Sequence, residues 1–408
     1  MMETLFGFLS LAIIFLLILI CAKKNNHIKS FLFVAFILRS GLVLLDQFDL
    51  IKLPDGYSDA LNFESIARKF SRDQGLMIVF DFFTTDSLLI SRIIAFFFTV
   101  FVESKMIAQF ISVGLGVSSV YLVYKLSLIL WDYRSAQKAA WIATLFPSLI
   151  LYSSITLREV YIVFFLLIGL IGIVKFLRTN SLNSFFQTMS SFFILSLFHG
   201  PSSIGGFVFL SYLILKLVKK QIINLYHFKI SLISIFFIFL FSIPPFLFLA
   251  GSISIPYIGG INELVYFDEN IQRINNYMFG TASYPPWLII ESKYEILSKG
   301  IIKIFYFLYS PFIWDIKTKY HLIGLFDGLM YVLLTIYLIR NWKSVWENPI
   351  TRIFLFLFIS YIIIYGLGVG NFGTGIRHRS KFVVILIVLA APKFHKFIFF
   401  KKEKLYKK

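Results

Sequence analysis

The chain has 408 residues, of which 58% are hydrophobic and 15% are charged, and its mean hydropathy is +0.83. Because soluble domains carry about 25% charged residues, this composition excludes an ordinary soluble protein and indicates a polytopic α-helical membrane protein. The net charge of +18 does not indicate a nucleic-acid partner, since the basic residues stand at the ends of apolar segments, as topology signals do.

The apolar runs predict an all-α, polytopic transmembrane helix bundle of about eleven spans, forming one integral-membrane domain over residues 1–408. The predicted spans are Leu5–Ala22, Ile28–Leu45, Ile107–Leu130, Ala139–Ser154, Val160–Phe176, Phe185–Phe198, Ile204–Leu217, Ile230–Ala250, His321–Ile339, Ile353–Leu367 and Phe382–Phe399. Two further runs, Leu88–Val102 and Ile301–Ile313, are too short or too interrupted to span, so we expect them to lie along the membrane or to re-enter it.

The first apolar run contains the only cysteine of the chain, Cys21. One cysteine excludes a disulfide framework and a cysteine-based metal site. No basic segment precedes this run and no small-residue cleavage pattern follows it, so we expect a retained helix rather than a signal peptide.

The distribution of basic residues predicts the orientation of the bundle. Alternating spans divide the connections into two sets, and the first set comprises 22–29, 125–138, 175–183, 216–229, 340–352 and the tail 393–408. This set contains 22 Lys and Arg residues, whereas the short connections of the other set contain four. By the positive-inside rule, the first set is cytoplasmic, which places the N-terminus outside and the basic tail inside.

Two long segments then fall outside the membrane, 46–106 and 251–320. They hold nine and six of the 21 acidic residues, respectively. Long loops of this kind usually carry function, and both are expected to contain amphipathic or interfacial helices.

The first long loop begins with several carboxylates in "DQFDLIKLPDGYSDALNFESIARKF". The sequence Pro-Asp-Gly is typical of a turn, and the apolar spacing after Asp59 predicts an amphipathic helix. Asp55 and Asp59 are candidate catalytic bases that would accept a proton from a sugar hydroxyl. The alternative for Asp59 is a cap at the start of that helix.

Two further outer turns carry candidate site residues. In "YSSITLREVY", Arg158 and Glu159 stand together where a span begins, and charges near the membrane are usually functional or paired. Glu159 is a candidate catalytic acid or base and Arg158 a candidate substrate ligand; the alternative is that the two form a mutual ion pair. In "LSLFHGPSS", His199 is a candidate substrate ligand or a hydrogen-bonding cap.

The densest charge cluster of the outer side is "GNFGTGIRHRSKF", residues 370–382. Arg377, His378 and Arg379 lie on the side that topology signals disfavour, which indicates an anionic partner. Guanidinium groups bind phosphates in a bidentate manner and remain charged at all physiological pH values. The alternatives are that the arginines reach outer lipid phosphates or that the topology is misassigned.

Other motifs are absent. There is no phosphate-binding P-loop, no dinucleotide fingerprint, no nucleophile elbow and no His-Glu-x-x-His pair, so neither a nucleotide nor a metal cofactor is expected, although metal dependence stays open.

Taken together, these segments resemble the integral-membrane glycosyltransferases of the GT-C superfamily, in particular the Wzy-type polymerases of bacterial O-antigen and capsule. The matching segments are 55–60, 146–159, "YSPFIW" at 309–314 and 373–382. The resemblance implies that Asp55 is the first-loop acid and that Arg377 and Arg379 bind the lipid-linked phosphate. The next acid after Asp55-Gly56 is Asp59, and no Trp-Trp-Asp motif occurs; both features favour the polymerase-like branch.

The resemblance implies an enzyme of the bacterial inner membrane that polymerises polyprenyl-pyrophosphate-linked oligosaccharide repeat units on the periplasmic side. Its partners would be the lipid-linked donor and acceptor, the bilayer, and a chain-length regulator and flippase of the same pathway. The alternatives are a transferase that uses a polyprenyl-phosphate sugar, a lipid-linked oligosaccharide flippase, and an accessory subunit. A flippase would show internal repeats and polar midplane residues, and here only Arg39 and Asp327 are candidates for the latter.

Overall fold

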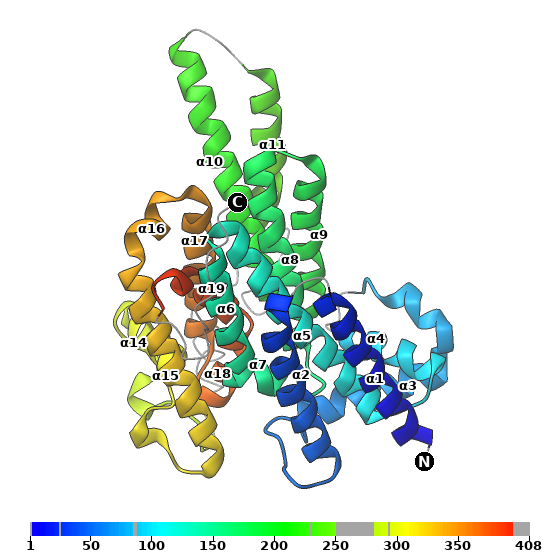
Figure 1. The fold of residues 1–408 in the computed structure, drawn as a ribbon. Coiled ribbons are helices and arrows are strands. Elements are labelled where there is room, and N and C mark those ends of the chain that lie inside the picture. Colours follow the sequence, from blue (N-terminus) through cyan, green and yellow to red (C-terminus); the bar gives the residue numbers. More distant parts are fainter. Residues whose placement is uncertain are drawn as a thin grey trace.

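A computed structural model describes residues 2–23, 26–84, 88–227, 231–249, 281–292 and 294–394. The regular structure in these ranges is entirely helical (Figure 1), and the only extended pairing among them is an isolated antiparallel bridge between Ser283 and Asn371. The predicted all-α class is therefore confirmed. The part of the second long segment at 250–280, and the tail beyond residue 394, lie outside the described residues.

Among the described residues, seven helices are long and apolar enough to cross a membrane, which supports the prediction of a membrane protein. They are α1 (Met2–Lys23), α2 (Asn26–Gln47), α5 (Lys105–Leu130), α8 (Arg158–Thr179), α10 (Ile204–Tyr226), α15 (Lys319–Arg340) and α17 (Pro349–Gly368). The count of about eleven spans stays a prediction.

The other four predicted spans are shorter or broken helices. They correspond to α6 (Tyr133–Leu145) with α7 (Pro147–Tyr152), α9 (Leu182–Phe198), α11 (Leu232–Leu249) and α19 (Val383–Ala390). The run Ala139–Ser154 was predicted to be one helix, but Phe146 has an extended backbone between α6 and α7. Pro147 explains the break, because proline lacks an N–H and disfavours a helical conformation in the residue before it.

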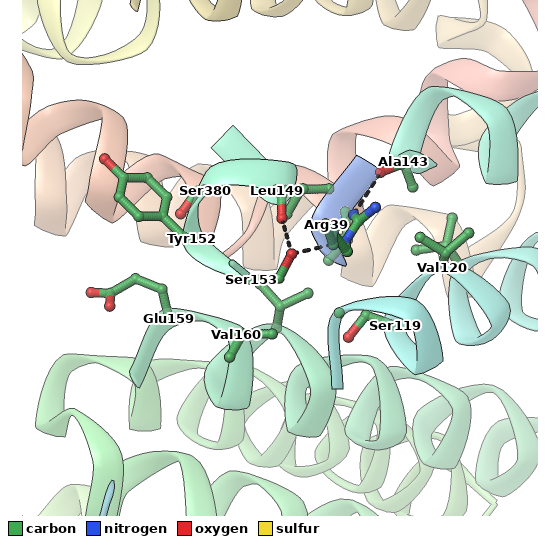
Figure 2. Close-up of a pocket in the computed structure, with 14 residues that line it drawn as sticks. Arg39, Ser119, Val120, Ala143, Leu149, Tyr152, Ser153, Glu159, Val160 and Ser380 are labelled. Carbon is green, nitrogen blue, oxygen red and sulfur yellow. Dashed lines mark hydrogen bonds between the residues drawn. The ribbon is translucent and has the colours of Figure 1, made fainter. Parts of the chain in front are cut away.

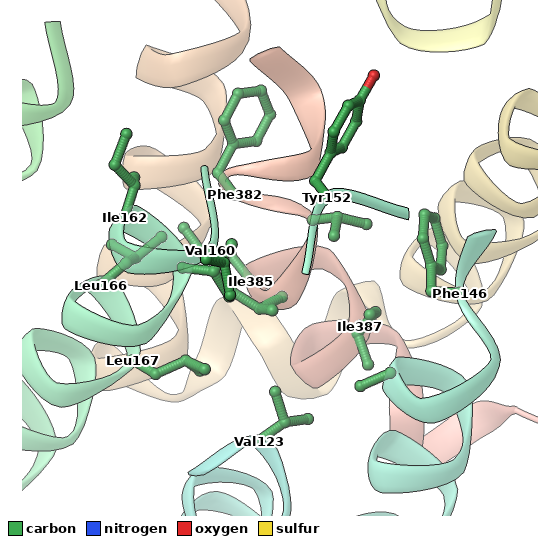
Figure 3. Close-up of a cluster of buried hydrophobic side chains, with 14 of the residues drawn as sticks. Val123, Phe146, Tyr152, Val160, Ile162, Leu166, Leu167, Phe382, Ile385 and Ile387 are labelled. Carbon is green, nitrogen blue, oxygen red and sulfur yellow. The ribbon is translucent and has the colours of Figure 1, made fainter. Parts of the chain in front are cut away.

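The last of these helices, α19, lies in the centre of the bundle, and all eight of its residues are buried. Figure 3 shows its residues Ile385 and Ile387 among Val123 of α5 and Leu167 of α8. The indole of Trp131 and the amide of Asn341 donate hydrogen bonds to α19 carbonyls, at 2.9 Å each. α19 therefore belongs to the protein core rather than to the lipid-facing surface.

Side-chain hydrogen bonds identify the helix ends that lie together at one end of the bundle. Arg178 at the end of α8 donates to Ile129 at the end of α5 (2.7 Å), and Lys138 of α6 donates to Pro392 after α19 (3.2 Å). These contacts join connections that carry the excess of Lys and Arg, and we call this the basic end. Its short helix α16 (Trp342–Glu347) joins α15 to α17.

The opposite end, called the acidic end, contains most of the shorter elements. They are α3 (Asp59–Gln74), η1 (Gly75–Asp81), α4 (Leu89–Val100), η2 (Gly200–Ser203), η3 (Pro286–Leu288), α14 (Glu295–Tyr309), η4 (Ile313–Asp315) and α18 (Phe372–Ser380); η5 (Ala391–Lys393) follows α19. The helix predicted from Asp59 onward is present as α3. It packs on α4, where Ser91 donates to the Phe63 carbonyl at 3.0 Å. The predicted alternation of spans, and which end faces the cytoplasm, stay predictions from hydropathy and charge.

Candidate active site

The predicted basic cluster folds as helix α18. Asn371 caps its start by accepting a hydrogen bond from the Thr374 amide at 2.7 Å. The preceding strand-like segment is held by two backbone bonds to the 282–284 segment, Phe372 N to Ala282 O and Tyr284 N to Gly370 O, both 2.9 Å. The cations fall in the last turn, where the negative end of the helix dipole favours them.

Arg377 joins three distant parts of the chain. Its Nε donates to Glu159 at the start of α8 at 2.8 Å, and its Nη1 pairs with Asp59 at the start of α3. The two carboxylates differ in exposure, since the Glu159 side chain is 1% exposed and the Asp59 side chain is 54% exposed. Arg377 is therefore held by one fixed partner and one partner that solvent and ligands can reach.

Several polar atoms in this group have no hydrogen-bond partner within the described ranges. They are Nη2 of Arg377, Nε of Arg158 and Oε2 of Glu159, all of them buried. Arg158 makes one long bond from Nη1 to the Phe198 carbonyl at 3.4 Å. Because buried polar groups are usually satisfied, the two open guanidinium donors leave room for hydrogen bonds to water or to the oxygens of an anion.

Asp55 lies beside the same group, in the turn that the sequence predicted. Its φ is +61°, a left-handed conformation that Asp and Asn tolerate better than most residues. Burial raises the pKa of Asp55, and the negative charges of Glu159 and Asp59 raise it further, whereas Arg377 and a hydrogen bond from Tyr152 lower it. The net shift is upward, which makes this carboxylate a stronger base.

Two histidines predicted as substrate ligands, His199 and His378, lie together with their ring centroids 5.4 Å apart. Tyr365 of α17 hydrogen-bonds Nδ1 of His199 at 3.0 Å and stacks on His378. Lys381 approaches Nδ1 of His378 at 2.7 Å and Glu159 at 3.6 Å. Burial, and then neighbouring cations led by Lys381, hold the pKa of both histidines well below the usual value.

A neutral His378 that accepts from Lys381 at Nδ1 carries its proton on Nε2. It can therefore donate a hydrogen bond without adding charge to the group. Burial also lowers the pKa of Lys381, although the Glu159 charge opposes that effect.

Arg379 does not share this environment. It is completely buried, its Nε lies 3.0 Å from the equally buried Asp327, and its Nη1 donates to the carbonyls of Phe307, Leu308 and Ser310 at 3.1, 2.8 and 2.7 Å. Asp327 in turn accepts from the Ser148 amide at 3.1 Å. Nη2 of Arg379 also lies 2.9 Å from Asp327, so the side chain is held inside the bundle by an ion pair and three carbonyls. These contacts favour a structural role for Arg379, and its role as a phosphate ligand stays a prediction.

A small cavity of about 20 Å³ lies beneath the group (Figure 2). Figure 2 shows Tyr152 and Glu159 on one side of it and Arg39 on the other. Arg39 is 1% exposed and donates to Ser153 at 2.8 Å and to backbone carbonyls of Ala35, Thr144 and Ala143. Arg39 therefore anchors α2 to the α6–α7 break.

Seven candidate site residues predicted from the sequence lie close together at the acidic end. They are Asp55, Asp59, Arg158, Glu159, His199, Arg377 and His378. The alternative reading, a mutual ion pair of Arg158 and Glu159, is not present among the described residues, where Glu159 pairs with Arg377 instead. Sequence reasoning did not single out Tyr365 or Lys381. Lys381 stands one helical turn beyond Arg377, so a helix predicted through residue 381 would have placed the two side chains on the same face. Tyr365 lies inside an apolar span and has no local sequence pattern that indicates a site.

A second buried contact links α3 to the loop before α8. Glu64, which is 1% exposed, accepts a hydrogen bond from the Thr156 hydroxyl at 2.6 Å. Burial raises the pKa of Glu64, and the Thr156 bond opposes this shift. The contact fixes the helix that carries Asp59 against the loop that carries Arg158 and Glu159.

We predict that Thr156→Val destabilises the protein by about 1–3 kcal/mol, because it leaves a buried acceptor without its donor. Thr156→Ser keeps the hydroxyl and is the matched control, with a loss of less than about half that amount. Thermal unfolding of the purified protein in detergent measures both. Equal unfolding temperatures for the Val and Ser variants would contradict the prediction.

No group of three or more His, Cys, Asp and Glu side chains in the described ranges is placed to hold a metal ion. Comparison with known proteins gives no family: no protein-family model matches the chain, and no curated protein matches it.

Proposed function

We propose that the protein is a membrane glycosyltransferase that acts at the acidic end of the bundle on a polyprenyl-pyrophosphate-linked glycan, most simply as a polymerase of oligosaccharide repeat units. The observation that supports this most is the geometry of Arg377, which joins the first long loop to α8 through Asp59 and Glu159. A carboxylate with a raised pKa, Asp55, lies beside it. A cation for a leaving group and a base for an acceptor are the two groups that glycosyl transfer requires.

In the proposed reaction, the acceptor hydroxyl oxygen attacks the anomeric carbon of the donor glycan. The bond from that carbon to the pyrophosphate oxygen breaks, its electron pair leaves with the pyrophosphate, and the hydroxyl proton passes to Asp55. Arg377 and Arg158 stabilise the negative charge on the departing pyrophosphate through the donors that have no protein partner. His378 donates a neutral hydrogen bond from Nε2 to a sugar or phosphate oxygen.

Asp59 has a different role in this scheme. Its exposed carboxylate neutralises Arg377 before substrate binds, and the phosphate oxygens displace it. Glu159 stays in place because it is buried, so it keeps the guanidinium oriented throughout. We therefore assign the base to Asp55 and a reversible pairing role to Asp59.

This assignment predicts that Asp55→Asn lowers the transfer rate at least about 100-fold, whereas Asp59→Asn costs less. Asn tolerates the positive φ of position 55, so the substitution keeps the turn. Because the pKa of Asp55 is raised, the transfer rate of the wild type should fall on acidification at a higher pH than it would with an ordinary Asp as the base. Asp59→Asn should keep this fall of the rate at acidic pH, and Asp55→Asn should lose it. The measurement is the transfer rate as a function of pH for the purified wild type and both variants in vesicles. A larger loss in Asp59→Asn than in Asp55→Asn would show that the base is Asp59.

The proposed function is tested by deleting the gene and separating the surface polysaccharide of the cells on a gel. A single repeat unit on the lipid core means that a polymerase is missing. A truncated repeat means a single-sugar transferase, including one that uses a polyprenyl-phosphate donor. Lipid-linked units that accumulate on the cytoplasmic face mean a flippase, and an unchanged polysaccharide would reject all three.

A further inference from the structure

A long apolar groove of about 700 Å³ lies away from the active site, between α1, α4 and α5. Figure 1 shows these three helices side by side at the edge of the bundle. On α1 the lining residues recur at helical spacing from Phe6 through Ile13 to Cys21. This stretch rises about 22 Å, at 1.5 Å for each residue, so the groove follows α1 over most of one membrane crossing.

The lining is almost entirely hydrocarbon. Phe97 of α4 and Ile111 of α5 contribute to it, and the serines Ser10 and Ser118 are among its few polar members. Much of α1 is exposed, since it packs against the bundle along one side only. In a membrane-spanning bundle such a groove opens to the bilayer, and an apolar surface there is covered by hydrocarbon chains.

The charges at the two ends of the groove differ. At the basic end the lining residues Cys21, Leu32 and Tyr121 belong to three different helices. Lys29 stands three positions before Leu32 and Lys125 four positions after Tyr121, so each lies on the same side of its helix as the lining residue. Lys23 is the last residue of α1, two positions beyond Cys21, and all three lysines are exposed. None of these lysines forms an ion pair within the described residues. At the acidic end, Glu3 of α1 stands near the lining residue Phe6 instead.

We propose that this groove binds one anionic phospholipid, with an acyl chain along α1 and the phosphate among Lys23, Lys29 and Lys125. The charge difference between the two ends fixes the direction of the lipid, because basic pockets between membrane helices bind anionic headgroups. The same difference assigns the lipid to the leaflet at the basic end. Neither the groove nor the three lysines take part in the proposed glycosyl transfer.

The experiment uses the full chain, purified in mild detergent and titrated with phosphatidylglycerol or phosphatidylcholine, with bound lipid counted by native mass spectrometry. The wild-type protein should retain one phosphatidylglycerol at least about tenfold more tightly than phosphatidylcholine. Lys23→Gln, Lys29→Gln and Lys125→Gln combined should abolish this preference. The matched control combines Lys216→Gln, Lys219→Gln and Lys220→Gln, three exposed lysines of α10 that lie near the basic end but do not line the groove, and it should keep the preference.

A second variant tests the groove itself. Ser118→Trp places a large side chain in the groove and should reduce the binding of both lipids while the three lysines remain. Equal affinity of the wild type for the two lipids, equal loss in the two lysine variants, or unchanged binding in Ser118→Trp would each overturn the proposal. A change from dimer to monomer in Ser118→Trp without a change in lipid binding would assign the groove to a second copy of the chain and would also overturn it.

Discussion

Arg377→Lys should lower the rate of glycan transfer by about 100-fold or more, although it keeps the positive charge. The guanidinium of Arg377 holds Glu159 through Nε and Asp59 through Nη1, and its Nη2 has no partner in the described part of the chain. A lysine ammonium cannot reproduce this fork. Removing one preorganised donor to a developing negative charge typically costs two to three orders of magnitude in rate, roughly 100- to 1,000-fold. The measurement is the rate of product formation by purified enzyme in vesicles, at saturating lipid-linked substrate.

A control variant separates this effect from a general loss of surface charge. Arg72 also forms an ion pair, with Glu103 at 2.7 Å, but its side chain is 70% exposed. Because exposed ion pairs contribute little, Arg72→Ala should leave the rate within about twofold of the wild type. Full activity in Arg377→Lys, with normal insertion into the membrane, would remove Arg377 from the reaction.

Arg379→Ala should mainly lower the stability of the protein, whereas Arg377→Lys should mainly lower the transfer rate. It leaves Asp327 as an unpaired carboxylate that is completely buried, and breaking a buried ion pair in this way costs about 3–5 kcal/mol. The unfolding temperature in detergent and the yield of inserted protein should both fall sharply. Transfer activity per folded molecule should fall much less than in Arg377→Lys.

Combined substitution of the pair tests the reason for that loss. Arg379→Met together with Asp327→Leu removes both charges and should recover part of the stability, since an apolar pair of similar volume avoids the unpaired charge. Recovery will be incomplete because three carbonyls lose the Arg379 donor. If Arg379→Ala instead folds normally and loses activity, then Arg379 belongs with the substrate ligands after all.

The different fates of Arg377 and Arg379 follow from helix geometry that the sequence already contained. Two residues that are two positions apart in a helix point to nearly opposite faces. The sequence pattern was interpreted as one cationic cluster because the segment 370–382 was assigned to a loop, whereas 372–380 is helical. Asp327 was visible as a charge within a span, but its partner was not, because a contact over 52 positions leaves no local pattern.

Local features were predicted more successfully than long-range ones. The turn at Asp55 and the helix from Asp59 follow from turn residues and apolar spacing, and both are present. The division of Ala139–Ser154 at Pro147 was missed because hydropathy outweighed the proline, although the local rule predicts a break. The meeting of Glu159, Tyr365 and Asp55 depends on tertiary packing and could only be expected in outline from the topology.

The burial of α19 constrains the order in which this protein is built. A helix of eight residues is too short to cross a bilayer, so it gains little by entering lipid alone. Its side chains are instead enclosed by α5, α6, α15 and α17, all made earlier during synthesis. α19 can therefore take its place only after these helices have been made, and Arg377, six residues ahead of α19, can reach Glu159 only at the same late stage of synthesis.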